Sequence, residues 1–480
     1  FQNLGYLVEA MSNYIQVLII NPSTTGVYSN AGAILRDVCF TEYDPKFDTF
    51  ILQILNERSH ARPSDICLAV LSLLRQKPQI QNMLKMFKSQ SSPEEITALI
   101  ENLSKESLFL KIMSLCPIAD LEFENMLRRL REKILRNIHT VTYTPSLGRV
   151  LSAIAVQCYV NEYIYKRANS EDKILVEIES RVSGTINDKP QACVKEILML
   201  ACYKPLHAYK WSAYIHQIED LAQVVELQIN QIEEDKKTAR SLKIFKEIAD
   251  SISIDVREQY EDSPYPRWID LKLEKVPLTV LEIGRRARLR ISNEAIYQCA
   301  SPKVLIAGCG TGQQSIEAGS RFKNSEILAV DLSTKSLSYA IRKTNEFGLK
   351  NIKYLQADIL DLYDLDQKFD VIECCGVLHH MDNPFKGWQV LANCLKPGGL
   401  MKVALYSKSA RGFVTEVRQE ILKLGINFDS ASIKRFRQMI IESEEQRHKS
   451  VQSFADFYCL SELRDLLFHI KEHQFTIPEI

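Results

Sequence analysis

The chain has 480 residues, in which 60 Lys plus Arg balance 60 Asp plus Glu. This neutral balance disfavours a general nucleic-acid binder, which usually shows a basic excess or patch. No apolar run approaches the roughly 20 residues that a membrane-spanning helix needs, so we expect no membrane insertion.

The twelve cysteines are scattered singly or as the pair Cys374-Cys375. They form no C-x-x-C motif and have no histidine at metal-ligand spacing, so we expect no metal site. Thiols in this pattern are typical of a reducing compartment, where they pack as small apolar side chains. We therefore expect a cytoplasmic protein.

Residues 1–250 predict an all-helical region. Apolar residues recur at helical spacing, in segments separated by Pro, Asn and Ser. We expect helices at residues 4–15, 47–55, 63–74, 80–87, 96–103, 121–138, 151–165, 171–182, 193–203, 213–232 and 241–248. Ser92, with Pro93 and Glu95, forms a capping pattern at one helix start. Such a region serves as a dimer interface or substrate platform, or it only covers a catalytic domain, and the sequence leaves both open.

Residues 251–300 contain the unusual run Y-E-D-S-P-Y-P-R-W, from Tyr260 to Trp268. Its two prolines predict an extended backbone and exclude a helix in this run. One interpretation is a lid over a ligand site, with Tyr265 or Arg267 contacting a carboxylate or the reacting group. The other is a linker whose aromatic side chains pack at a domain boundary.

A glycine-rich loop follows a short apolar strand at residues 304–307. Gly308, Gly310 and Gly312 alternate in it, and a helical pattern comes next. Glycine lets the backbone turn sharply and lets a ligand approach closely, while the helix start offers free N–H groups. Because residue 313 is Gln, the loop is G-x-G-x-G and lacks the third glycine position of the dinucleotide motif G-x-G-x-x-G. This spacing disfavours NAD.

Four more apolar runs follow, at residues 326–331, 352–356, 369–375 and 401–406, separated by helical segments. Alternating strands and helices predict an α/β domain with a doubly wound sheet at residues 301–408. Polar residues stand at the carboxyl ends of the strands. Among them Asp331 lies about 20 residues beyond the loop, where a carboxylate binds ribose hydroxyls.

Residues 409–480 predict a helical C-terminal region, with helices at 414–424, 433–442 and 460–468. A sheet of this class normally ends in an antiparallel hairpin instead. Either that hairpin lies beyond Ile480, or the helices are inserted before it. In the second case they would form a wall of the acceptor cavity, with Phe457, Tyr458 and Arg464 facing inwards.

The stretch from Lys303 to about Tyr406 resembles the class I S-adenosylmethionine-dependent methyltransferases. The lid motif, the loop A-G-C-G-T-G-Q-Q and the run D-F-Y-C-L-S-E-L-R-D-L-L-F-H together resemble a bacterial methyltransferase family with a helical N-terminal region. Within it, the rickettsial protein-lysine methyltransferases that modify outer membrane protein B are the most similar. This resemblance implies S-adenosylmethionine as cofactor, S-adenosylhomocysteine as product, a surface-protein lysine as acceptor and a homodimer.

The resemblance also implies a role for each motif residue. Gly308, Cys309 and Gly310 would contact the methionine end of the cofactor, and Asp331 the ribose. Leu332 and Ile359 would cover the two faces of the adenine, although either could be an ordinary core residue. Asp358 would accept the adenine amino group. The remaining members of the predicted cofactor site are Gly312, Gln313, Ser333, Cys375, Gly376, Val377, Tyr260, Arg267 and Trp268.

The methyl acceptor needs a lone pair, and a lysine amine with a reference pKa near 10.4 is mostly protonated at neutral pH. A nearby group must then take its proton. We expect Tyr265, His379 and Tyr458 to include this group, with His380 as a further candidate. Two other readings stay open, namely a methyltransferase for a small molecule or RNA, and a non-enzymatic helical interaction module.

Overall fold

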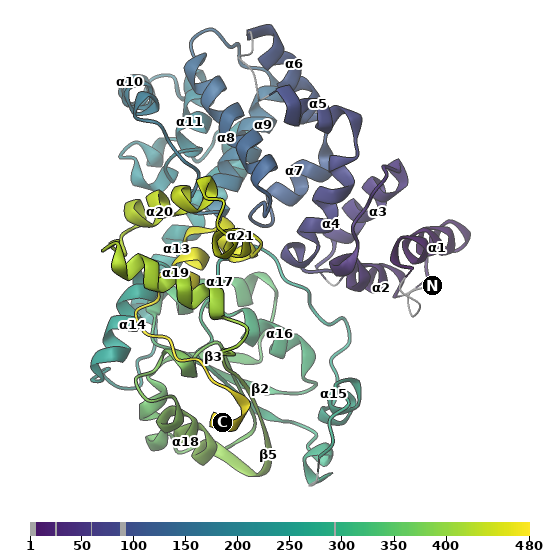
Figure 1. The fold of residues 1–480 in the computed structure, drawn as a ribbon, viewed down its shortest axis with the longest axis vertical. Helices are drawn as coiled ribbons and strands as arrows, with labels where there is room; N and C mark the ends of the chain where they lie inside the picture. Colours follow the sequence, from purple (N-terminus) through teal and green to yellow (C-terminus); the bar gives the residue numbers. More distant parts are fainter. Residues whose placement is uncertain (1–5, 25, 59, 87–92, 292–293) are drawn as a thin grey trace.

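A computed structural model describes residues 6–24, 26–58, 60–86, 93–291 and 294–480. Figure 1 shows a large helical part, coloured purple to blue, and a sheet with flanking helices, coloured green. The yellow-green helices near the C-terminus lie between these two parts.

The first part consists of helices, as predicted. Five of them begin with proline, because proline needs no hydrogen-bond partner in the first turn; these are the helices that start at Pro45, Pro63, Pro78, Pro93 and Pro145. The predicted cap at Ser92 lies outside the described residues. The α-helices are α1 (Leu7–Ile20), α2 (Val27–Ile34), α3 (Pro45–Asn56), α4 (Pro63–Arg75), α5 (Pro78–Met86), α6 (Pro93–Ser104), α7 (Ser107–Met113), α8 (Leu121–Arg136), α9 (Pro145–Val160), α10 (Asn169–Thr185), α11 (Val194–Ala201), α12 (Ala222–Val225) and α13 (Gln231–Ser241).

Two of the predicted helices were wrong in extent. The one expected at 213–232 is divided into short turns, with α12 followed by a π-helical turn at Glu226–Asn230. The one expected at 241–248 does not form, because α13 ends at Ser241. The next residues are extended along the edge of the sheet instead, where Phe245 N donates to Gln356 O at 2.9 Å and Gln356 N donates to Lys243 O at 3.0 Å.

The second part is an α/β domain with a parallel sheet, which confirms the predicted fold class. Its central strands are mostly buried apolar runs, the pattern expected for a parallel sheet covered on both faces, whereas the two edge strands are partly exposed. They are β1 (Lys303–Ala307), β2 (Glu326–Asp331), β3 (Ile352–Gln356), β4 (Phe369–Cys375) and β5 (Leu395–Ala404), in the order β3-β2-β1-β4-β5. The flanking helices are α14 (Ser251–Asp262), α15 (Val280–Arg286), α16 (Gln313–Arg321), α17 (Thr334–Glu346) and α18 (Pro384–Cys394).

The C-terminal helices share one apolar core with the N-terminal helices. They are α19 (Gly412–Lys423), α20 (Ser430–Glu442), α21 (Gln446–Gln452) and α22 (Leu460–Phe468). Val417, Phe436 and Phe468 belong to the same buried cluster as Leu127 and Ile154. The helical part of the molecule is therefore built from both ends of the chain.

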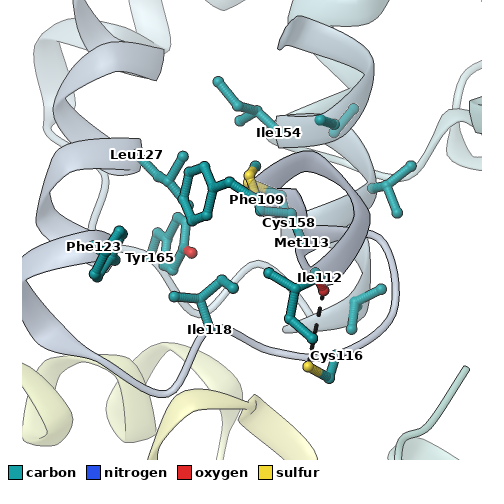
Figure 2. Packing of buried hydrophobic residues seen from close by; sticks show 14 of the residues in the cluster. Phe109, Ile112, Met113, Cys116, Ile118, Phe123, Leu127, Ile154, Cys158 and Tyr165 are labelled. Carbon is teal, nitrogen blue, oxygen red and sulfur yellow. Dashed lines mark hydrogen bonds between the residues drawn. The ribbon is translucent and has the colours of Figure 1, made fainter. Parts of the chain in front are cut away.

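Figure 2 shows part of this core, where side chains from α7, α8 and α9 meet. The rings of Phe109 and Phe123 lie 5.4 Å apart between centroids. Cys116 Sγ lies 3.8 Å from the carbonyl oxygen of Ile112, and Cys158 is buried in the same cluster. These thiols fill apolar space, and none of the described cysteines forms a disulfide.

After α22 the chain returns to the open side of β5. Phe475 N donates to Tyr406 O at 2.9 Å, and Lys408 N donates to Phe475 O at 3.0 Å. In the sequence, the C-terminal helices thus lie between β5 and this returning segment. The bridge that joins the segment to the end of β5, between Ser407 and Phe475, is parallel. Among the described helices, none has the length and apolar character needed to cross a membrane.

Candidate functional site

A cavity of about 440 Å³ opens at the carboxyl ends of β1, β2 and β4. Ligands bind at this edge in open α/β sheets, and the volume suits a ligand of cofactor size. The predicted site residues that line the cavity are Gly308, Cys309, Gly310, Gln313, Asp331, Leu332, Asp358, Ile359, Cys375, Gly376, Val377, Tyr260 and Tyr265.

The glycine loop lies under two other parts of the chain. A Cβ atom at residue 308 would lie 2.3 Å from a methyl group of Val377, and one at residue 310 would lie 2.5 Å from the carbonyl oxygen of Tyr265. Both glycines also have positive φ angles, of 71° and 52°. Only glycine satisfies both conditions here without strain, so the loop is shaped to lie against the segment that contains Tyr265.

Two aspartates project from the ends of neighbouring strands. Asp331 accepts hydrogen bonds from Gly310 N at 2.7 Å and from Ser333 N at 3.0 Å, which fix the orientation of its carboxylate at the cavity wall. Asp358 accepts from Leu360 N at 2.9 Å. Burial raises the pKa of both carboxyl groups. Each has oxygen lone pairs left for a ligand donor.

Helix α14 forms a wall of the cavity that the sequence analysis missed. It contributes Ile252, Ser253, Val256 and Tyr260. The extended run predicted from Tyr260 onwards was wrong at its start, because α14 continues to Asp262. Prolines constrain only their own position and the preceding one, so Pro264 and Pro266 leave Tyr260 free to be helical. The spacing i, i+4, i+8 of Ile252, Val256 and Tyr260 is a helical signal that could have identified this wall.

The segment after α14 divides its side chains between the cavity and the surrounding protein. Tyr265 and Pro266 line the cavity, whereas Arg267 and Trp268 do not. The Arg267 guanidinium lies 4.6 Å from the ring centre of Tyr159 on α9. Trp268 Nε1 donates to Thr311 Oγ1 at 3.0 Å, and Thr311 Oγ1 donates to Pro266 O at 2.6 Å. Arg267 and Trp268 therefore anchor the segment instead of contacting a ligand.

The two histidines after β4 point in different directions. His380 lines the cavity, but His379, which we predicted as catalytic, does not. The ring of His379 stacks on Tyr406 with 3.7 Å between centroids, and burial lowers its pKa to about 2. The two rings point in different directions because they follow each other in the short 3₁₀ turn Leu378–His380, in which successive side chains diverge. His379 is thus a neutral packing residue in this structure.

Tyr458, the third predicted catalytic residue, lies in the helical core. Its hydroxyl donates to Gln452 O at 3.1 Å, and Arg437 covers its neighbour Phe457 at 4.5 Å from the ring centre. Arg464 is paired with Asp262. The inward orientation expected for these three side chains is wrong, because the C-terminal helices turn their apolar faces to the N-terminal helices.

Gly312 and Ser333 also lie outside the cavity lining. Gly312 is the cap residue before α16, with a φ angle of 88°, and its Cα faces Ala340. Ser333 caps α17, since its Oγ accepts from Ser336 N at 3.1 Å. Both residues position the ends of helices that border the cavity.

Two buried polar atoms at the cavity have no partner among the described residues. Gln314 Oε1 is one, although Gln314 Nε2 donates to Cys375 O at 3.3 Å, and Ser336 Oγ is the other. Buried polar atoms are normally hydrogen-bonded, so these two are free to bond to polar groups of a ligand. The cavity therefore combines apolar surfaces, two carboxylates and unused polar atoms.

Comparison with known families assigns this region. Residues 304–399, from β1 into β5, match the family described as a methyltransferase domain. The chain contains a class I methyltransferase domain. The loop, Asp331 and Asp358 fall within the matched residues, and the cofactor of this domain is S-adenosylmethionine.

The methyltransferase domain has many relatives. The chain is 33% identical over 128 residues to an uncharacterized protein of Synechococcus sp., covering 26% of this chain and 31% of that protein. It is 28% identical over 152 residues to a ubiquinone biosynthesis O-methyltransferase of Paracidovorax citrulli, covering 32% of this chain and 61% of the enzyme. The chain thus spans less than two thirds of each of these relatives.

One similar solved structure is that of PKMT2 from Rickettsia typhi in complex with AdoHcy. It is 22% identical with a TM-score of 0.32, and the match covers 37% of each chain.

The residues of the methyltransferase domain fit the methyl donor. Asp331 and Asp358 offer acceptors for hydroxyl and amino groups, and Leu332 and Ile359 offer apolar faces for an aromatic ring. Gln314 Oε1 and Ser336 Oγ offer unused hydrogen-bonding capacity. This match rests on the chemistry of the lining and not on the family alone.

Proposed function

We propose that the protein is an S-adenosylmethionine-dependent methyltransferase that modifies lysine amines of a protein. The acceptor would be an unfolded or extended bacterial surface protein, such as outer membrane protein B, modified in the cytoplasm. The motif resemblance between Tyr260 and His469 supports this proposal. The observation that carries it is the negative charge beside the acceptor side of the cavity.

Carboxyl groups from the C-terminal region act on the two cavity-lining tyrosines, Tyr260 and Tyr265. Asp465 accepts from Tyr260 Oη at 2.8 Å. Burial is the main cause that raises the pKa of Tyr265 well above its ordinary value, and the negative charges of Asp465 and Asp456 add to it. A cationic acceptor such as an ammonium group is stabilised by this environment, whereas an anionic one is repelled.

The cavity also lacks the cations that a nucleic acid needs. Among the described residues that line it, none is Lys or Arg. Binding to RNA or DNA depends on Lys and Arg contacts to phosphates. This composition favours an amine acceptor over an RNA base.

The methyl donor supplies an electrophilic methyl group on a sulfonium when it is bound, so the protein mainly has to position the acceptor. Tyr265 and Pro266 close the cavity from one side, and α14 closes it from another. Exclusion of water by these apolar surfaces lowers the pKa of a bound amine, while the nearby carboxylates raise it, so the site still needs a group that accepts the amine proton.

The test uses methyl-labelled S-adenosylmethionine and an unfolded protein acceptor, reduced and alkylated lysozyme. A matched acceptor is the same protein with its lysines acetylated, which removes both the charge and the nucleophile. We expect label on lysines of the first acceptor only, located by mass spectrometry. An Asp331→Ala variant should label neither acceptor.

Other outcomes would replace the proposal. Label on both acceptors equally would exclude lysine. Transfer to a catechol or to RNA, without transfer to lysozyme, would favour the small-molecule or RNA reading. Failure to bind S-adenosylhomocysteine would favour the non-enzymatic helical module.

We further propose that the helical region 1–250 forms a substrate platform and a homodimer interface. Helix α1 supports the interface because its side chains Ile19 and Ile20 are 63% and 83% exposed. Large apolar residues that are exposed next to one another often mark a surface that another protein covers, whereas single exposed ones are common. A two-fold dimer is the commonest arrangement that covers such a face.

A further inference from the structure

We propose that Tyr260, with Asp465 and His469 behind it, is the proton acceptor for the amine in this cavity. The inference rests on the proposed function, because it needs an amine acceptor. It assigns to Tyr260 a task other than cofactor binding, and it replaces His379 and Tyr458 as candidate bases.

The geometry places one phenol between the cavity and two buried side chains. Tyr260 lines the cavity. Its hydroxyl lies 2.8 Å from Asp465 Oδ1 and 3.1 Å from His469 Nε2. Asp465 and His469 are 3% and 0% exposed, so bulk water does not reach them directly, whereas Tyr260 joins them to the cavity.

The hydrogen bonds around His469 determine which group donates and which accepts between His469, Tyr260 and Asp465. Lys471 N donates to His469 Nδ1 at 3.2 Å, so in the neutral ring the proton is on Nε2. His469 Nε2 then donates to Tyr260 Oη, and the hydroxyl proton of Tyr260 is directed to Asp465. A phenol oxygen has two lone pairs, which leaves one lone pair of Tyr260 for an N–H group in the cavity.

A metal ion is the competing explanation, because ligand atoms of His380, Asp465 and His469 lie within 4.8 Å of one another. The hydrogen bonds disfavour it. In the neutral ring of His469 only Nδ1 has a lone pair that could bind a metal, and this lone pair already accepts a hydrogen bond from Lys471 N. The ring of His469 also stacks on His380 with 3.5 Å between centroids, an arrangement that both neutral rings can keep without an ion.

The charges that face Asp465 leave its carboxylate able to accept a proton. Arg411 and Arg418 approach from the α19 side, but both face Glu472, with closest distances of 2.9 and 3.8 Å. Asp456 adds negative charge from the turn before α22. Burial raises the pKa of Asp465 to about 6, which makes it a stronger base than an exposed aspartate and still ionised at pH 7.

The proton balance is simple. The ammonium nitrogen donates a proton to Tyr260 Oη while the Tyr260 hydroxyl proton passes to Asp465 Oδ1. The amine becomes neutral and nucleophilic, Asp465 becomes neutral, and Tyr260 ends as a phenol again. No oxidant, metal or second substrate is required.

The experiment measures single-turnover methylation of reduced and alkylated lysozyme between pH 6 and 9.5. The variants are Tyr260→Phe and Asp465→Asn. The matched control is Tyr203→Phe, which removes a similar buried hydrogen bond, from Tyr203 Oη to Glu171 Oε1 at 2.5 Å, within the helical part.

At pH 7 we expect Tyr260→Phe to slow transfer by about 100-fold, the lower range for lost proton transfer. Its rate should recover by roughly tenfold per pH unit as the amine deprotonates in solution. Affinity for S-adenosylhomocysteine should stay within about threefold, since the ring is retained. Asp465→Asn should show the same slow rate and the same recovery, and Tyr203→Phe neither.

Three results would overturn the relay. In the first, Tyr260→Phe lowers the methylation rate by the same factor at every pH, which is the effect expected of a structural defect. In another, both variants behave like Tyr203→Phe while the wild type transfers normally. In the third, EDTA abolishes transfer and Zn²⁺ restores it, which would favour a metal at His380, Asp465 and His469. If the wild type itself does not methylate lysozyme, the proposed function fails first, and the two failures are thereby distinguished.

Discussion

Arg437 on α20 and Glu124 on α8 form a bidentate ion pair, with nitrogen–oxygen distances of 2.8 and 2.6 Å, inside the core shared by the two ends of the chain. Both side chains are almost fully buried, at 2% and 5% exposure. Removal of one partner leaves an unpaired buried charge. We expect Glu124→Ala to lower the free energy of unfolding by about 3–5 kcal/mol.

Thermal unfolding of Glu124→Ala measures this loss. Glu132→Ala on the same helix is the control, because it removes a partly exposed pair with Arg136 and should cost less than about 1 kcal/mol. Equal effects of the two substitutions would contradict the assignment of the Glu124–Arg437 pair as a major contact.

Asp331 should dominate the affinity for the product S-adenosylhomocysteine. If Asp331 binds the ribose as proposed, Asp331→Ala would remove two charge-assisted hydrogen bonds and should cost on the order of 3 kcal/mol, more than a hundredfold in Kd. Calorimetry measures this change. Asp366→Ala, at an exposed position after β3, should bind like the wild type. Near wild-type binding by Asp331→Ala would remove Asp331 from the cofactor site.

Gly310→Ala should disrupt the contact between the loop and the lid segment. The new methyl group would meet the Tyr265 carbonyl, and the positive φ angle costs a further 1–2 kcal/mol or so. We expect affinity for S-adenosylhomocysteine to fall by at least about tenfold. Gly184→Ala on α10 is the control, since its Cβ has open space, and it should stabilise the helix by up to about 1 kcal/mol. An unaffected affinity would show that the lid backbone moves away easily.

Asp465 should make stability depend on pH. Its pKa is about 6 in the folded protein, above the ordinary value of 3.8. Between about pH 4 and pH 6 the unfolded chain ionises first, so the folded state loses stability as the pH rises. Asp465→Asn removes this loss and should be more stable than the wild type at pH 8, by at most about 3 kcal/mol. Melting curves at pH 5 and pH 8 test this, and a gap that does not widen with pH contradicts it.

The proposed dimer predicts that α1 takes part in association. Light scattering at micromolar concentration should give twice the mass of one chain. The double substitution Ile19→Glu with Ile20→Glu should convert the dimer to a monomer, because it places charges in an apolar contact. Ile477→Glu, at an 85% exposed position near the C-terminus, is the control. A wild-type monomer refutes the dimer, and a dimer that survives the substitutions refutes α1 as its interface.

The sheet and its ligand edge were predictable because they depend on short-range patterns. The central strands are apolar runs, and Asp331 and Asp358 stand at strand ends, where position alone places them beside a ligand. The last strand was predicted only in part, because β5 begins at Leu395 and includes the Lys396-Pro397-Gly398-Gly399 run before the apolar residues. The cavity lining includes most of the predicted cofactor residues for this reason.

The rest of the site depends on contacts between distant residues. Tyr260 and Asp465 are 205 residues apart, and no spacing rule in a single sequence connects them. Arg267 and Tyr458 were attractive candidates by residue type, yet Arg267 packs on Tyr159 of α9 and Tyr458 is buried in the shared helical core. His379 and His380 differ only by the direction that a short turn gives each ring, which composition cannot reveal.

The shared helical core also has a consequence for the order in which the chain folds during synthesis. Residues 303–404 supply every strand of the sheet, so the catalytic domain has all its strands soon after it leaves the ribosome. The N-terminal helices are made earlier, but their apolar surface is covered by residues between Val414 and Phe468, which are made after the sheet. An incomplete chain therefore exposes that surface throughout synthesis of the catalytic domain, which makes it a ligand for chaperones and sensitive to any pause between α18 and α19.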